Sequence, residues 1–492
     1  MNRLKKIPFF LLLLPVFFCL HGGLENFGVI YFSEAVVTGL YISLALGLLF
    51  LLLVWITGNR TDAALICFYA GLFYLFFGAL QDWLNEIKWL SFLNRYAVLI
   101  PFLLLSIIGL LFLFRKKKQI RPRIFLYLNV LLILYCLLDA TLLLRKSFFH
   151  SKGSANIAFD LSKVKDKPNV YYLLFDGYPG YASLQSQFGY KNDSLYSFLQ
   201  NKGFKVLPAI SNYNFTIFSM SSIFNMKYVD NNYEHEHQLR DQQDFRNRFI
   251  EIKKAEVFSI YKKMGYRFQN LSIFDIGKQG PVNPEISFLP VHTKVLTAKM
   301  LHKRLIRHIG WKFRGTILEG AFAFKEPIFQ TDTTNRYIET TLKQSLTKKS
   351  DNPTFCYAHL VMPHSPYFRD SSGTPINKTG QLPWKNENDT RYFLPYLKYT
   401  NSVITSITNE IVIKDPGAII VIMSDHGFRN YEYQKKYYAA AFDNLCAVRL
   451  PGNDTIPFGN SRSGVNFFRY LFNSRYGQQI PYIKDSTIWI NY

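Results

Sequence analysis

Residues 418–427 read AIIVIMSDHG, and this stretch decides the fold. Its first six residues are a short, uninterrupted apolar run, which is typical of a strand buried on both faces in a parallel sheet flanked by helices. Asp425 and His426, two side chains able to bind a metal, follow at once, and Gly427 permits a tight turn. Ligands in open α/β sheets bind beyond the carboxyl ends of strands, so the position suits a functional site. An Asp-His pair by itself is more often part of an ordinary polar loop, and further strands of the same form are needed to favour a metal site.

Two further runs have the same form. Residues 169–175 (NVYYLLF) end in Asp176, and residues 354–360 (TFCYAHL) lead within a few residues to His364. An Asp-Gly dipeptide such as Asp176-Gly177 is also a common turn, which is the alternative interpretation. If the three runs are strands of one sheet, their ends place oxygen and nitrogen ligands on one rim, and that ligand set suits Zn or Mn.

Four motifs occur in an order that resembles the alkaline phosphatase and sulfatase superfamily. They are FDG (175–177), NFTIFS (214–219), the stretch His359–Pro366 and SDHG (424–427). The chain is most similar to the membrane-anchored sulfatase-like branch, which includes lipoteichoic acid synthases and lipid A phosphoethanolamine transferases. The resemblance extends over roughly residues 167–490 and includes residues 396–401 and 463–473.

The resemblance implies a role for each matching residue. Asp176, Asp425 and His426 become metal ligands, Thr216 becomes the nucleophile that also contacts the metal, and His364 lies beside the transferred group or on a second metal. Chemistry supports the role of Thr216, because an unactivated hydroxyl is a poor nucleophile and metal coordination is one way to activate it. Without such ligands, Thr216 would be a loop hydroxyl or a helix cap.

The chain departs from the family pattern at two points. It has no Cys/Ser-x-Pro-x-Arg motif, so a formylglycine sulfatase in the strict sense is disfavoured. The transferases usually have Glu at the end of the first strand, where this chain has Asp176, the residue of the phosphatase and phosphodiesterase branches. Hydrolysis therefore stays open beside transfer.

The first 145 residues are predicted to form a membrane domain. Apolar blocks occur at about 7–24, 35–57, 63–82, 96–114 and 124–144. Each is near the ~20 residues that a membrane-spanning helix needs, the first being the least certain. Residues 1–6 resemble the start of a signal peptide, but no small-x-small cleavage site follows, so we expect an uncleaved anchor.

Charge predicts the orientation of these five spans. Lys and Arg concentrate at residues 3–6, at Arg60 and at 115–123, whereas the intervening loops hold Lys88 and Arg95. By the positive-inside rule, the chain after residue 145 lies outside a bacterial cytoplasmic membrane, on the periplasmic or extracellular side. Trp83 and Trp89 suit an aromatic belt on that side.

Residues 146–166 are predicted to be a linker, and residues 167–492 an external catalytic domain. Two cysteines, Cys356 and Cys446, lie in strand-like runs of that domain. We expect buried free thiols, with a disulfide between them as the alternative.

The formal net charge is +23, from 57 Lys and Arg against 34 acids. An external, membrane-tethered domain does not meet nucleic acid, so anionic lipid headgroups and phosphate-bearing glycans are the expected partners. The densest basic stretch, residues 299–312, has apolar residues at helical spacing. It is either an interfacial helix or a solvated helix packed on the domain. His302 and His308 are spaced by six and are not expected to share a metal.

The sequence therefore predicts a polytopic α-helical membrane domain followed by an α/β sulfatase-like domain with a mostly parallel central sheet flanked by helices. The predicted function is metal-dependent transfer of a phospholipid-derived headgroup, of the phosphoethanolamine or phosphoglycerol type, to an envelope glycan or glycolipid through a phospho-Thr intermediate. A phosphate or sulfate ester hydrolase and a non-catalytic envelope protein are the alternatives.

Overall fold

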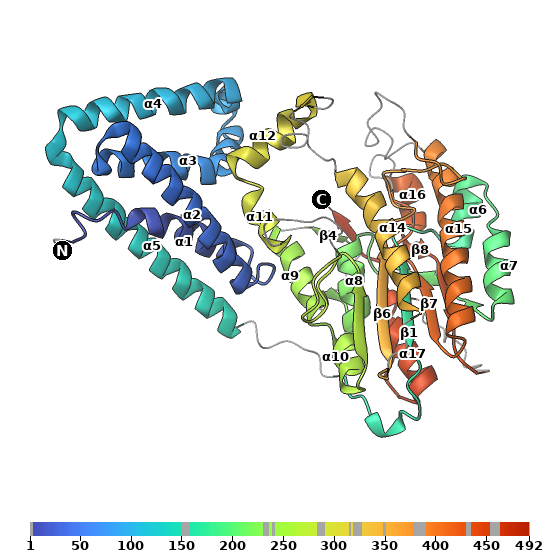
Figure 1. Cartoon of the computed structure of the whole chain (residues 1–492). Coiled ribbons are helices and arrows are strands. Elements are labelled where there is room, and N and C mark those ends of the chain that lie inside the picture. The colour runs from blue at the N-terminus through green and yellow to red at the C-terminus, as the bar shows by residue number, and fades with distance from the viewer. Residues whose placement is uncertain are drawn as a thin grey trace. The chain divides into compact units, whose positions relative to one another are not determined.

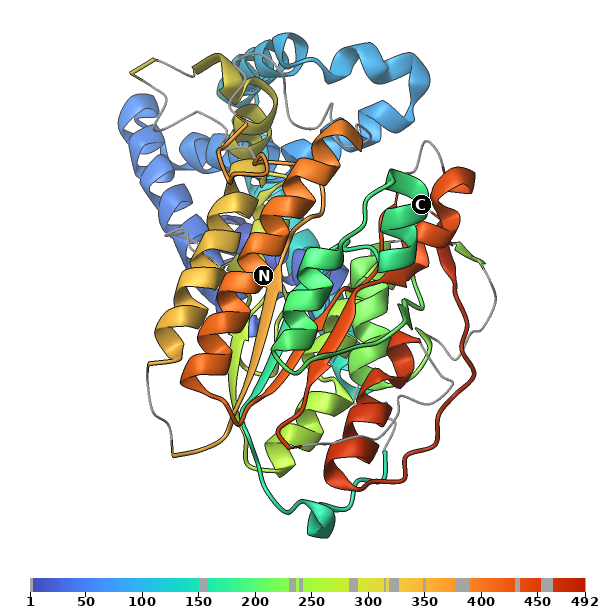
Figure 2. The ribbon, with the colours of Figure 1, turned by 90° about the vertical axis from the view of Figure 1, so that its right-hand side faces the viewer.

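The computed structural model divides the chain into two compact units, which Figures 1 and 2 show as ribbons. One comprises Met1–Gly153 with Ile286–Lys325, and the other Ser154–Glu285 with Glu326–Tyr492. We call them the helical unit and the external unit. The structure describes residues 3–149, 157–229, 236–238, 242–282, 291–313, 316–317, 327–347, 351–376, 390–429, 434–452 and 463–491.

Each predicted apolar block of the first 145 residues forms a helix. The helices are α1 (Phe10–Glu25), α2 (Phe32–Thr57), α3 (Arg60–Glu86), α4 (Tyr96–Lys116) and α5 (Arg121–Phe149). Four of them, α2 to α5, are long and apolar enough to cross a membrane. Helix α1 has 16 residues, so it is about 24 Å long, shorter than the ~30 Å hydrocarbon core. Five crossings therefore stay a prediction, and α5 continues beyond the predicted span into the linker.

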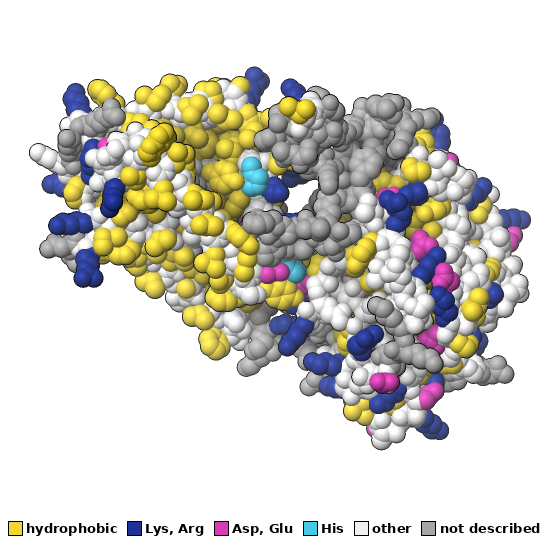
Figure 3. All heavy atoms as spheres, viewed as in Figure 1, with side chains coloured by type: hydrophobic (Ala, Val, Ile, Leu, Met, Phe, Trp, Pro, Cys, Tyr) yellow, Lys and Arg dark blue, Asp and Glu magenta, His cyan; other side chains and the backbone are white. Residues whose placement is uncertain are grey.

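The surface of the helical unit is apolar. Figure 3 shows hydrophobic side chains over much of its visible face. On α2, seven large apolar side chains are between 61% and 80% exposed: Phe32, Leu40, Leu44, Leu48, Leu51, Trp55 and Ile56. Large contiguous apolar surface is costly in water, whereas in lipid it costs nothing. The exposed faces therefore fit a bilayer.

Several polar groups inside the helical unit pair across helices. Arg121 at the start of α5 lies 2.9 Å from the Asp62 carboxylate on α3. The Asn129 side chain accepts from the Phe10 amide at 2.7 Å and donates to the Leu4 carbonyl at 2.8 Å. These contacts hold α3 and α1 against α5 in surroundings where an unpaired polar group is expensive.

Residues 291–313 belong to the helical unit, although the sequence predicts them as part of the external domain. They form the short helices α11 (Lys294–Thr297) and α12 (Leu301–Ile309), and α12 packs on α3. The described contacts of this segment therefore contradict a helix packed on the external domain.

The external unit contains a six-stranded, mostly parallel sheet in the order β2-β9-β7-β1-β6-β5. The strands are β1 (Val170–Phe175), β2 (Lys205–Val206), β5 (Arg267–Leu271), β6 (Thr354–Leu360), β7 (Ile419–Met423) and β9 (Cys446–Arg449). Strands β7, β1, β6 and β5 pair in parallel, and β9 pairs antiparallel with both β7 and β2. Two small sheets join β3 (Ala209–Ile210) to β8 (Asp443–Asn444) and β4 (Glu236–Gln238) to β10 (Trp489–Asn491).

Alternate side chains of the central strands enter two cores. From β1, Tyr172 and Leu174 face one core, and Leu173 and Phe175 face the other. The first core is covered by α8 (Thr216–Asn225), α9 (Gln242–Lys253), α10 (Glu256–Lys263) and α17 (Phe467–Tyr476). The second is covered by α6 (Tyr181–Phe188), α7 (Asp193–Asn201), α14 (Pro327–Ser345), α15 (Thr390–Lys414) and α16 (Gln434–Phe442). Burial on both faces explains why the sequence shows continuous apolar runs.

The two external cysteines are free. Cys356 on β6 joins one core, and Cys446 on β9 joins the other, so the sheet separates them. This arrangement excludes the alternative of a disulfide between them and confirms buried thiols.

The positive-inside pattern predicts the side on which the C-terminal residues lie. An enzyme that matures only outside the cytoplasm should be active when fused after Tyr492, since basic residues flank the opposite helix ends. The same reporter fused after Gly58, in the loop between α2 and α3 next to Arg60, is the control and should be inactive. Activity measured in intact cells checks both fusions, and the reverse pattern would contradict the predicted orientation.

Candidate active site

The three predicted motifs meet at one edge of the central sheet, as the sequence predicts. Strands β7, β1 and β6 are parallel neighbours, so the residues after each strand end on the same side. The Asp176 amide donates to the Leu360 carbonyl at 3.0 Å, and the His364 amide donates to the Asp176 carbonyl at 3.1 Å. These backbone bonds join the loop after β1 to the loop after β6.

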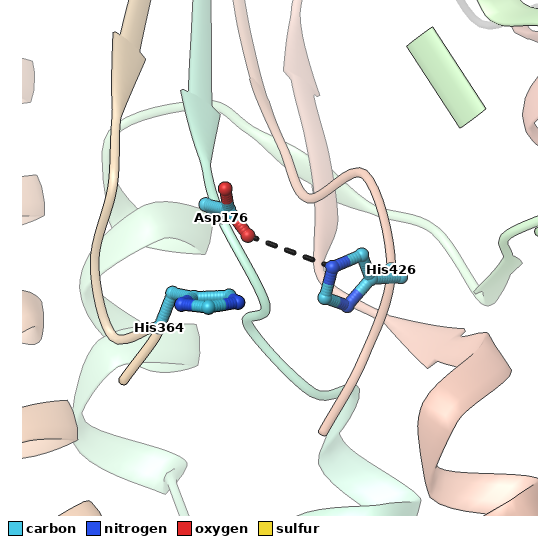
Figure 4. Close-up of side chains that lie close together, drawn as sticks. All are labelled: Asp176, His364 and His426. Carbon is cyan, nitrogen blue, oxygen red and sulfur yellow. Dashed lines mark ion pairs between the residues drawn. The ribbon is translucent and has the colours of Figure 1, made fainter. Parts of the chain in front are cut away.

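Asp176, Asp425 and Thr216 all point at the same nitrogen, His426 Nε2. The distances from this nitrogen are 3.6 Å to Asp176 Oδ1, 3.4 Å to Asp425 Oδ2 and 3.4 Å to Thr216 Oγ1. Figure 4 shows Asp176 and His426 facing each other with His364 beside them. The four predicted residues around the metal therefore lie together.

The hydrogen bonds around His426 and Asp425 leave their metal-facing atoms free. His426 Nδ1 lies 2.7 Å from the Gly427 carbonyl, which only accepts, so Nδ1 carries the proton and Nε2 a lone pair. Asp425 Oδ1 accepts from the Gly177 amide at 3.1 Å, and Gly177 has φ +71°, a conformation that favours glycine. Residues Asp176 and Gly177 thus form a turn, and the Gly177 amide also positions the Asp425 carboxylate.

Two buried carboxylate oxygens at this point, Asp176 Oδ1 and Asp425 Oδ2, have no hydrogen-bond partner among the described residues. Two such charges in the same pocket are costly unless a cation lies between them. With the lone pair of His426 Nε2 and the hydroxyl of Thr216, they form a donor set of oxygen and nitrogen atoms that fits Zn or Mn. The residues present therefore fit a divalent metal.

The protonation states suit metal binding. Burial by itself raises the pKa of Asp176, but the electrostatic attraction of the nearby His364, His426 and His359 imidazoles and the His359 hydrogen bond outweigh it and hold that pKa well below its usual range. Burial lowers the pKa of His426, which favours the neutral imidazole. A deprotonated carboxylate and a neutral imidazole are the forms that bind metal.

His359 is a site residue that sequence reasoning did not assign a role. It is fully buried on β6, and its Nε2 lies 3.3 Å from Asp176 Oδ2. Its Nδ1 lies 3.1 Å from the Tyr357 hydroxyl, whose pKa burial raises well above its ordinary value. Tyr357 therefore donates to His359, and His359 donates to Asp176, which fixes the orientation of the carboxylate. The sequence signal was a polar residue two positions after Tyr357 in an otherwise apolar strand.

Arg429 is the second residue that sequence reasoning missed. It donates to the Asn214 carbonyl at 2.6 Å and to His364 Nε2 at 3.0 Å, and it lies over the Phe215 ring at 4.8 Å. His364 Nδ1 in turn donates to the Ser365 carbonyl at 2.5 Å. His364 Nε2 is thus engaged by Arg429 in this arrangement, which favours a role beside the transferred group over a second metal. The available signal was the position of Arg429, three residues after His426.

A cavity of about 160 Å³ opens onto this site. Its polar lining includes His364, His426 and Arg429, and Phe393 and Phe428 are part of its apolar lining. Thr216 begins helix α8 next to it, with Phe215 as the preceding residue. The cavity thus brings the Arg429 guanidinium and His364 to His426, whose Nε2 lies 3.4 Å from the Thr216 hydroxyl.

Residues 169–450, more than half of the chain, match the family described as Sulfatase. The chain belongs to the Sulfatase family. The matched region contains the five predicted site residues, and the family assignment makes the protein an enzyme that acts on sulfate or phosphate esters. No curated protein matches the chain.

Three solved structures are similar to this chain at low identity. The C-terminal periplasmic domain of EcEptC from Escherichia coli has 13% identity and a TM-score of 0.41, covering 69% of this chain and 92% of that one. A sulfatase from a glycosaminoglycan-metabolism locus of Bacteroides thetaiotaomicron has 15% identity and a TM-score of 0.40, covering 64% and 74%. The phosphonate monoester hydrolase SpPMH from Silicibacter pomeroyi has 13% identity and a TM-score of 0.38, covering 65% and 76%. The family assignment rests on the sequence match and not on these structures.

Replacing Asp425 by Asn should abolish metal binding without unfolding the protein. Asparagine keeps the oxygen that accepts from Gly177 but removes the charge aimed at His426. Metal analysis of purified protein should show about one divalent ion in the wild type and almost none in Asp425→Asn. Asp193→Asn, an exposed acid on α7, is the matched control. Retention of the metal in Asp425→Asn would remove Asp425 from the ligand set.

Replacing His359 by Gln should weaken metal binding although His359 is not a ligand. Loss of the bond to Asp176 Oδ2 frees the carboxylate to rotate. Removing a group that orients a metal ligand in this way costs about 10- to 100-fold in metal affinity. Titration with Zn and a competing chelator measures the effect. Tyr357→Phe removes the hydrogen bond to His359 and should reduce metal affinity less than His359→Gln does. A larger reduction in Tyr357→Phe would contradict a chain of hydrogen bonds from Tyr357 through His359 to Asp176.

Proposed function

We propose that the protein transfers a phospho-headgroup from a membrane phospholipid to an envelope glycan or glycolipid, through a phospho-Thr216 intermediate. The observation that carries the proposal is the hydroxyl of Thr216, 3.4 Å from His426 Nε2 and beside two buried carboxylate oxygens without partners. A divalent metal at Asp176, Asp425 and His426 would activate this hydroxyl and neutralise developing charge. The headgroup, of the phosphoethanolamine or phosphoglycerol type, is part of the proposal.

The reaction divides into two displacements at phosphorus. In the first, Thr216 Oγ1 loses its proton and forms a bond to phosphorus, the bond from phosphorus to the diacylglycerol oxygen breaks, and that oxygen takes up a proton. In the second, a hydroxyl of the acceptor loses its proton and attacks the same phosphorus, the bond from phosphorus to Thr216 Oγ1 breaks, and Oγ1 takes up a proton. A covalent intermediate of this kind separates one difficult step into two easier ones.

Arg429 and His364 complete the proposed site. Arg429 keeps its charge at any physiological pH and has a planar group that matches phosphate oxygens, so it suits the transferred phosphoryl group. When Arg429 pairs with phosphate, His364 Nε2 is released from the contact at 3.0 Å and becomes available to the leaving or attacking oxygen. This sequence of contacts supports general acid and base work by His364.

The helical unit supports a membrane-borne donor. Four helices are long and apolar enough to cross a membrane, whereas a single helix suffices to anchor an enzyme that acts on soluble esters. We place the enzyme in a bacterial cytoplasmic membrane with the external unit on the outer side. The set of partnerless carboxylates argues against a non-catalytic domain, because without a metal these charges only destabilise the fold.

Thr216 variants test the proposal in vesicles that contain a phospholipid labelled in both headgroup and acyl chains. Thr216→Ala should lose diacylglycerol release and protein labelling by at least about 1000-fold but retain the metal, since the nucleophile is gone. Thr216→Ser restores a hydroxyl at the same position and is the matched control, which should keep measurable activity. Full activity of Thr216→Ala would show that another group is the nucleophile.

The acceptor distinguishes transfer from hydrolysis. If release of diacylglycerol is slow alone and rises when envelope glycan is added, with the headgroup label moving to the glycan, the enzyme is a transferase. Rapid release that no glycan alters would instead support an ester hydrolase with the same site residues.

A further inference from the structure

Residues 291–313 are held on the helical unit by a close backbone contact. The Gly78 amide on α3 donates to the Lys299 carbonyl at 2.7 Å. A Cβ at Gly78 would lie 2.7 Å from that oxygen and 2.8 Å from Lys299 Cα, so the approach requires glycine at this position. On the same segment, Leu296 and Met300 are buried in the main apolar core of the helical unit.

Three side chains of α12 and one that precedes α11 add specific polar pairs. Arg304 makes a two-pronged contact with the Asp82 carboxylate on α3, at 2.8 and 2.9 Å. His302 Nδ1 lies 2.6 Å from the Tyr74 hydroxyl with stacked rings, and His308 Nδ1 lies 2.7 Å from the Tyr96 hydroxyl on α4. His292 Nδ1 lies 2.9 Å from the Glu34 carboxylate at the start of α2. His302 and His308, which are not expected to share a metal, thus attach α12 to α3 and α4.

Three of the four side-chain partners lie near helix ends that the charge pattern places outside, whereas Tyr74 and Gly78 lie further inside α3. Asp82 is in the last turns of α3, Tyr96 begins α4, and Glu34 is in the first turn of α2. Two exposed tryptophans, Trp83 at 53% and Trp89 at 75%, flank the same level. Aromatic residues of this kind mark the boundary between lipid and water. With the predicted orientation, this level corresponds to the external surface of the cytoplasmic membrane.

Helix α12 has three distinct faces. Its protein-facing side contains Leu301, which joins the cluster of Phe77, Leu84 and Leu99. At successive turns of about 100° per residue, Leu305, Ile306 and Ile309 form an adjoining stripe. They are partly exposed and join none of the buried clusters among the described residues. The exposed Lys303 and Arg307 lie on the opposite side.

We propose that α12 lies in the lipid–water interface on the external side of the cytoplasmic membrane. Leu305, Ile306 and Ile309 would lie in the acyl region, and Lys303 and Arg307 among anionic lipid headgroups. The stripe adjoins His302, which stacks on the exposed Tyr74 of α3, so it continues the apolar surface that fits lipid. Charge favours the same occupant, because cations on the outward face attract phosphate-bearing headgroups.

This attachment is separate from the one that α5 supplies. The chain passes between the two units after residue 149, again between residues 282 and 291, and again between residues 313 and 327. The inference does not depend on the reaction that the active site catalyses.

An environment-sensitive fluorophore at Ile309 tests the proposal in the full-length protein. The probe is a nitrobenzoxadiazole label on Ile309→Cys, with Lys303→Cys as the matched position on the opposite face. Cys136→Ala is the parent, since the other four cysteines, Cys19, Cys67, Cys356 and Cys446, are buried. Burial also raises the pKa of the Cys356 and Cys446 thiols to about 12, which keeps them unreactive. The vesicles contain phosphatidylethanolamine and phosphatidylglycerol, with iodide in water or a nitroxide on the acyl chain as quencher.

We expect the label at 309 to be quenched by the acyl nitroxide and to resist iodide at least about fivefold better than the label at 303. Equal iodide quenching at both positions would overturn the proposal and show a solvated helix. Protection of 309 from both quenchers would also overturn it, because a second protein surface would then cover the stripe. Ile306→Cys, on the same stripe, repeats the measurement if the Ile309 variant fails to fold, as judged by its elution in detergent.

Discussion

The candidate site of the external unit depends on two buried carboxylates, Asp176 and Asp425, that face the same point. Asp176 Oδ1 and Asp425 Oδ2 both face His426 Nε2, within 3.6 Å, and neither oxygen has a hydrogen-bond partner among the described residues. Desolvated carboxylates are expensive, and their mutual repulsion adds to the cost. A divalent cation offsets both terms, so metal binding and the local stability of this sheet edge are coupled.

The polar atoms around these ligands are arranged so that the ligands cannot turn away. The Gly177 amide holds one oxygen of Asp425, the Gly427 carbonyl holds the proton of His426, and His359 holds the second oxygen of Asp176. Gly427 also lies where a Cβ would be 2.0 Å from the Ala440 carbonyl, so the loop passes tightly against α16. Such support holds a site in one geometry before substrate arrives, which lowers the cost of reaching the transition state.

In the helical unit, too, buried charges are paired, and its exposed surface suits lipid in place of water. Its outer faces carry large apolar side chains, and the buried charges Asp62 and Arg121 pair with each other at 2.9 Å. The docked segment adds a second layer at the membrane surface, in which Arg304 and Asp82 form the central pair.

Local patterns in the sequence were enough to predict the main elements and the residues that meet at the edge of the sheet. Apolar runs are local patterns, so β1, β6, β7 and the long helices were predictable, and the residues Asp176, Asp425 and His426 followed because the ends of parallel strands meet at one edge. His359 was not predictable in the same way, since a histidine within an apolar strand has no local sign of its partner on β1.

Only the tertiary structure decided the long-range partners. Arg429 reaches His364 across 65 residues, and Arg304 reaches Asp82 across 222. The sheet also separates Cys356 from Cys446, which no spacing in the sequence reveals. Residues 291–313 joined the helical unit because a glycine on α3 admits their backbone and four polar side chains on α2, α3 and α4 pair with theirs. Complementarity between distant surfaces is a property of the folded chain and not of any local pattern in it.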